Sequence, residues 1–225
     1  MVQNQTRRIV WGLLAACAAT TIGQVMAAQP LETLLPNTTR GYLSVPDVQR
    51  FRAHWQATQF GQLMRDSAMK PFAEDLRRQL QERITRLHQR IGLQLADLEG
   101  VAGGEASVAV VERSDGRAAV VVLVDVTGHV DKARGVLTKM GNRLVERQAK
   151  KETRQVAGAE LTVYTLPPVE GTQQPREAAL FVHNQMLCGC DSRAIAESIL
   201  QRFATPDNSA LAQQSAYHYI MTRCQ

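Results

Sequence analysis

Residues 106–126, ASVAVVERSDGRAAVVVLVDV, contain two apolar, β-branched runs on either side of an Asp-Gly pair. Asp-Gly between two such runs is among the strongest short-range signals for a β-hairpin. The second run, Val120–Val124, hardly alternates between polar and apolar residues, which is typical of a strand buried on both faces. This stretch therefore predicts a hairpin that supplies a central strand of a sheet.

Other β-signals lie on both sides of this hairpin. A short strand is expected at Gly41–Val45, where Pro46 ends it because proline cannot donate to a ladder. Two more hairpins are expected downstream, at 154–166 around Ala157-Gly158 and at 178–190 around His183-Asn184.

Four stretches have helical spacing of their apolar residues. They are expected from Val48 (capped by Asp47), from Pro71 through Leu95, from His129 through Lys151, and from Asp191 or Ser192 through Phe203. The second has the clearest period, with an apolar stripe at Phe72, Leu76, Leu80, Ile84, Leu87, Ile91 and Leu95. Hairpin-joined strands with intervening helices predict one α+β domain over residues 29–225, a largely antiparallel sheet with helices packed on one face.

The first 28 residues have the layout of a secretory signal peptide. Arg7 and Arg8 precede an apolar run, and small residues allow cleavage after Ala27, so that Ala28 would begin the mature chain. There are two alternatives. The segment is a lipobox in which Cys17 is acylated, or it is an uncleaved membrane anchor. We therefore expect an exported protein, periplasmic or extracellular, that is membrane-anchored if this segment is lipidated or retained.

Composition excludes some classes of function. Cleavage would remove two of the 26 basic residues, leaving 24 against 21 acidic ones, a net charge of +3. This excess is too small to indicate nucleic acid as a partner. The sequence also lacks the common signatures of hydrolases, nucleotide-binding loops and zinc enzymes, so no catalytic residue, cofactor or metal ligand is predicted.

Two groups of residues are candidates for a site. Cys188 and Cys190 would share one face of a strand, and we favour a structural role, in which one is buried and the other forms a disulfide with Cys224 or with a cysteine beyond residue 225. The alternatives are a strained disulfide between the two that serves in redox chemistry, or part of a soft-metal site. The second group, Lys139, Arg143, Arg147 and Lys151, recurs every four residues. We favour a solvated helix face for it over contact with an anionic surface.

Several landmarks resemble a family of uncharacterised exported bacterial proteins that is defined by a domain of unknown function. They are Leu34–Thr39 leading into Gly41–Asp47, then Phe60–Met64, Met69–Phe72 and the Gly-rich step into paired Val-rich strands. The likeness covers most of residues 31–221 and implies export and fold, without a reaction. Because the chain stops inside an expected helix, we also expect the domain to continue past residue 225.

These observations favour a non-enzymatic, exported protein that binds or scaffolds an envelope protein or an anionic surface. A thiol-redox or metal-handling protein that uses Cys188 and Cys190 is one alternative. The N-terminal part of a larger exported hydrolase is another.

Overall fold

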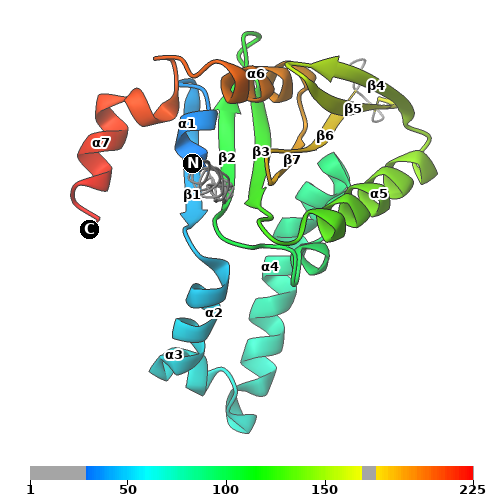
Figure 1. Cartoon of the computed structure of the whole chain (residues 1–225). Coiled ribbons are helices and arrows are strands. Elements are labelled where there is room, and N and C mark those ends of the chain that lie inside the picture. Colours follow the sequence, from blue (N-terminus) through cyan, green and yellow to red (C-terminus); the bar gives the residue numbers. More distant parts are fainter. Residues whose placement is uncertain (1–28, 169–175, 225) are drawn as a thin grey trace, which may run out of the picture.

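The computed structural model describes residues 29–168 and 176–224, and in these residues seven strands form one antiparallel sheet. The strand order is β1-β2-β3-β7-β6-β5-β4 (Figure 1). The strands are β1 (Thr39–Val45), β2 (Ala106–Glu112), β3 (Ala118–Asp125), β4 (Lys150–Val156), β5 (Ala159–Leu166), β6 (Arg176–His183) and β7 (Met186–Cys190). The predicted α+β class and antiparallel sheet are confirmed.

The three predicted hairpins are all present, as β2–β3, β4–β5 and β6–β7. Ala157 and Gly158 have φ of 50° and 79°, the paired positive values of a tight hairpin turn. The last turn lies at Asn184 and Gln185, with φ of 46° and 61°, one residue later than expected. Antiparallel pairing of β3 with β7 then joins the two halves of the sheet.

Helices cover both faces of the sheet, whereas the sequence analysis predicted helices on one face only. One hydrophobic cluster lies beneath α1 (Leu31–Leu34) and α6 (Arg193–Ala204), near the short η3 (Leu211–Gln213). The other lies beneath the end of α4 (Lys70–Ile91) and beneath α5 (Val130–Glu146). The reason is that β3 and β7 are apolar on both sides, so each side must be shielded from water.

Two helices end earlier than their apolar periodicity predicts. Helix α4 stops at Ile91, because Gly92 has φ of 74°, and Leu95 begins a separate turn, η2 (Leu95–Leu98). Helix α5 stops at Glu146 and the chain reverses at Gln148, where φ is 64°. The predicted helix through Lys151 is therefore wrong, since residues from Lys150 onward pair with β5.

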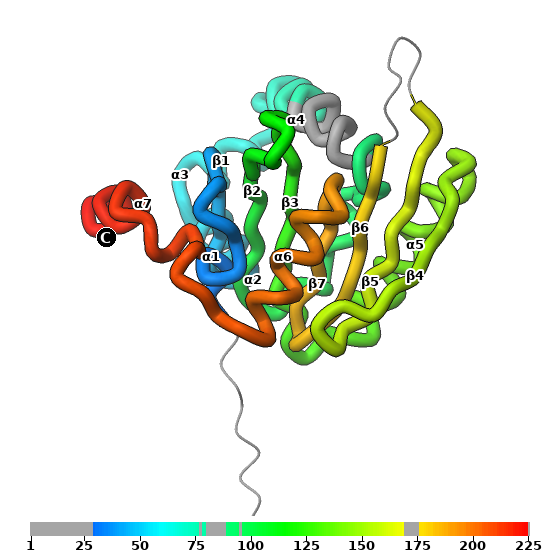
Figure 2. The backbone as a smooth tube through the Cα atoms, turned by 90° about the horizontal axis from the view of Figure 1, so that it is seen from above, coloured from blue at the N-terminus to red at the C-terminus, as the bar shows by residue number. Residues whose placement is uncertain are grey.

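A helical arm extends beyond the end of the sheet where β1 stops (Figure 1). We define this helical arm as residues 48–79, which include α2 (Val48–Ala57), α3 (Gln59–Leu63), η1 (Ser67–Met69) and the first part of α4. At the β1 edge, α7 (Ser215–Met221) lies outside the sheet (Figure 2), with the rings of Tyr42 and Tyr217 6.1 Å apart. The arm packs against the cluster beneath α5 through Val48, and α7 packs against the cluster beneath α6 through Tyr217.

Candidate functional site: an exposed aromatic surface on the helical arm

The helical arm carries large apolar side chains that the fold leaves exposed. Phe51, Trp55 and Phe60 are 54%, 44% and 45% exposed, and we call these three residues the aromatic surface. Leu63 and Phe72 of the arm are exposed to a similar degree. The three rings together leave on the order of 300 Å² uncovered, a size at which exposed apolar patches commonly mark binding sites.

The rings of the aromatic surface contact one another. Phe51 and Trp55 are one helical turn apart on α2 and stack with ring centroids 6.2 Å apart. Phe60 meets the Trp55 ring edge-to-face at 5.4 Å. Both distances fall in the range at which aromatic pairs attract, so the three side chains form one contiguous patch.

Local sequence explains how α3 folds back onto α2. Asp47 caps α2 by accepting from the backbone N–H of Arg50 at 2.8 Å, as predicted. Thr58 ends α2 and begins α3, because its hydroxyl donates to Trp55 O and accepts from the N–H of Gly61. A Cβ on Gly61 would overlap the carbonyl oxygen of Trp55, so this tight junction requires glycine.

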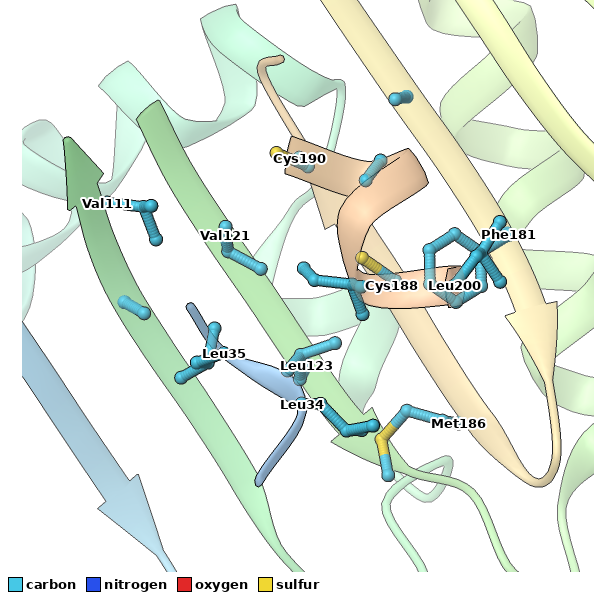
Figure 3. Close-up of a cluster of buried hydrophobic side chains, with 14 of the residues drawn as sticks. Leu34, Leu35, Val111, Val121, Leu123, Phe181, Met186, Cys188, Cys190 and Leu200 are labelled. Atoms are coloured by element: carbon cyan, nitrogen blue, oxygen red, sulfur yellow. The ribbon is translucent and has the colours of Figure 1, made fainter. Parts of the chain in front are cut away.

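The cysteines that the sequence singled out lie elsewhere, in the middle of the sheet (Figure 3). Cys188 and Cys190 share one face of β7, are fully buried and are both free, and the Cys190 thiol donates to Ser192 O at 3.2 Å. Burial raises the pKa of both thiols, which keeps them protonated. Cys224 is free and exposed beyond α7. This placement is that of apolar packing residues, and the described residues hold no group of three or more potential metal ligands.

Gly189 accounts for the spacing of these cysteines. Gly189 faces the cluster beneath α4 and α5, on the other side of the sheet from the thiols. A Cβ at this position would lie 3.1 Å from Ile91 Cδ1 and 3.4 Å from Met140 Cε. Side chains of α4 and α5 therefore occupy the space beside the glycine on one face, while the thiols lie on the opposite face, beneath α6.

The four basic residues do not form one stripe. Lys139 and Arg143 lie on α5, Arg147 caps it, and Lys151 lies on β4. Arg143 pairs with Asp97 and also donates to Gly92 O at 3.1 Å. Burial opposes the ionisation of Asp97, but the hydrogen bonds and charge of Arg143 lower its pKa overall. Arg143 thus fastens α5 to the segment that follows α4.

A polar network that the sequence did not reveal ties β1 to β2. The Glu105 carboxylate accepts from Tyr42 Oη at 3.0 Å and from the Ser44 hydroxyl. Burial, followed by the charges of Glu32 and Glu105, raises the pKa of Tyr217 to about 12. The alternation of β1, which puts Tyr42 and Ser44 on one face, was the available signal. The Leu31 N–H also donates to Glu105 at 3.4 Å, and the Tyr217 ring contacts that of Tyr42, so α1, β1 and α7 meet at this edge.

The predicted processing positions Cys17, Ala27 and Ala28 lie outside the described residues. Within 29–168 and 176–224, none of the helices has the length and hydropathy needed to cross a bilayer. Comparisons with protein-family models, with curated proteins and with solved structures give no match. The resemblance to an exported family of unknown function therefore stays a prediction.

Proposed function

We propose that this chain is an exported, non-enzymatic binding protein of the cell envelope, and that the aromatic surface on the helical arm is where it binds. The observation that supports the proposal is the contact of the Trp55 ring with those of Phe51 and Phe60, outside both hydrophobic clusters. These three aromatic side chains contact one another but remain about half exposed. A partner that covers them would remove the rest of their apolar surface from water, which favours binding.

The arrangement of the sheet and the helical arm fits a role in binding. The sheet, with α5 and α6 on opposite faces, holds both buried clusters and supports the arm, which extends from one end of it (Figure 1). Val48, at the start of α2, packs against the cluster beneath α5, so the base of the arm is fixed to that support. A recognition surface on such an element can be covered by a partner without disturbing the core.

Site-specific photo-crosslinking in the producing cells tests the proposal. One variant carries p-benzoylphenylalanine in place of Trp55, which keeps an aromatic ring at the centre of the patch. The matched control carries it in place of Val145, which is 51% exposed on α5 and outside the arm. We expect position 55 to crosslink a defined envelope component, protein or lipid, and position 145 to give no such adduct.

A second pair of changes makes the result specific. Phe51→Ser with Phe60→Ser removes both neighbours of the probe, and we expect it to abolish the adduct at position 55. The proposal is wrong if position 55 gives no adduct, or gives the same adducts as position 145.

A further inference from the structure

The segment that carries the aromatic surface has charges of one sign. From Val48 to Arg65 the sequence contains Arg50, Arg52 and Arg65 and no Asp or Glu. The acidic residues that flank it, Asp47 and Asp66, are occupied as helix caps. Phe51 lies between Arg50 and Arg52 in the sequence, so the aromatic surface belongs to a segment that has three arginines and no carboxylate.

These guanidinium groups are available to a ligand at modest cost. Arg52 pairs with Glu99 at 3.0 Å, but both side chains are more than 60% exposed. Such exposed ion pairs contribute little free energy and are readily exchanged. Arg65 donates to the backbone oxygen of Gln56 at 2.7 Å, which leaves other N–H groups of its guanidinium for a further acceptor.

Tryptophan, phenylalanine and arginine together on a short amphipathic helix are typical of segments that lie at a bilayer surface. Aromatic rings settle at the level of the lipid headgroups, and arginine binds phosphate through two parallel hydrogen bonds. A second copy of the chain fits less well, because a two-fold interface would bring two acid-free, positively charged segments together.

We propose that the aromatic surface binds a bilayer that contains anionic phospholipid, with Phe51, Trp55 and Phe60 among the headgroups and Arg50, Arg52 and Arg65 on the phosphates. This inference rests on the proposed function, since it names the partner of the same surface. Charge complementarity distinguishes the anionic bilayer from a neutral one.

The chain offers a direct reporter. It has two tryptophans, so Trp11→Phe in the full chain leaves Trp55 as the single fluorophore. We expect its emission to shift to the blue when vesicles of phosphatidylglycerol and phosphatidylcholine (1:1) are added at low salt. Vesicles of phosphatidylcholine alone should cause no shift, and the shift should shrink as salt rises. The emission of Trp55 reports contact of the arm with the bilayer and does not report binding through the N-terminal segment.

Matched charge variants complete the test. Each basic residue near an anionic surface contributes roughly a factor of five to binding, so Arg50→Gln, Arg52→Gln and Arg65→Gln together should weaken it on the order of 100-fold. The control removes three exposed cations outside the arm, at Arg40, Lys132 and Arg134, and should bind with nearly unchanged affinity.

Three results would overturn the inference: no shift with anionic vesicles, an equal shift with neutral ones, or a shift that grows with protein concentration when vesicles are absent. The last would indicate self-association. The proposed function fails separately, because a protein adduct at position 55 in cells would support it even where vesicles have no effect.

Discussion

Gly61→Ala is expected to open the junction between α2 and α3 while leaving the sheet intact. The added Cβ would overlap Trp55 O and lie 2.9 Å from the Trp55 carbonyl carbon, closer than the ~3.5 Å at which carbons normally rest. The obstructing atoms belong to the backbone, so a side-chain rotation cannot relieve the overlap. The two helices must therefore separate.

Separation removes two interactions, and these set the size of the effect. The Thr58 cap of α3, in which the N–H of Gly61 donates at 3.0 Å, contributes about 1 kcal/mol. The Trp55–Phe60 pair at 5.4 Å contributes about 1 kcal/mol more. We expect the junction to lose about 2 kcal/mol, a shift of roughly 30-fold in the local equilibrium. Unfolding of the core should change little, because none of these residues belongs to either cluster.

The assay uses Trp55 emission and its quenching by acrylamide, with Trp11→Phe in every sample. Gly61→Ala should redden the emission and increase quenching as Phe60 moves away. The control is Gly135→Ala on α5, where a Cβ would have no atom within 4 Å, and where helix propensity favours alanine by up to about 1 kcal/mol. Unchanged quenching in Gly61→Ala, or a fall in the urea midpoint typical of a core substitution, would refute the reasoning.

Three further outcomes are expected from the packing of the sheet and its helices. Gly141→Ala should lower the free energy of unfolding by about 1–3 kcal/mol, because the added Cβ would overlap Tyr164 Oη. In a double-mutant cycle measured by urea unfolding, Tyr164→Phe should restore part of this loss. Additive effects of the two substitutions would contradict the contact. The Asp97 pKa is lowered in the folded state, so its stabilising pair with Arg143 is present above pH ~4 and is lost as pH falls below it. Asp97→Asn should therefore cost about 1–3 kcal/mol at pH 7 and flatten the acid limb of a stability-versus-pH curve; an unchanged limb would argue against it. In thiol titration of the folded chain with Cys17→Ser, Cys224 should react fast and the two buried β7 thiols should react after unfolding; fast reaction of all three would show that β7 is accessible.

The hairpins and the helix starts were predictable because short-range interactions decide them. The Asp-Gly pair at 115–116, the Ala157-Gly158 turn and the Asp47 cap each act within four residues of chain, so they can be recognised without knowledge of the rest of the fold. Phe51 and Trp55 are four residues apart, so their side chains align once the helix that was predicted from Val48 forms. That they stay exposed could not be seen, because exposure depends on what packs against a helix.

The sequence alone determined the α+β class, the three hairpins and the burial of β3 on both faces, which the structure shows for Val121–Val124. Tertiary structure decided the pairing of β3 with β7, the cover on both faces and the switch from α5 to strand at Lys150. The physical reason is one of range. Hydrogen bonds and caps between neighbours in the chain are encoded locally. The residues from Lys150 onward instead pair with the edge of β5 although their spacing is helical, because strand pairing and burial outweigh a weak local preference for helix.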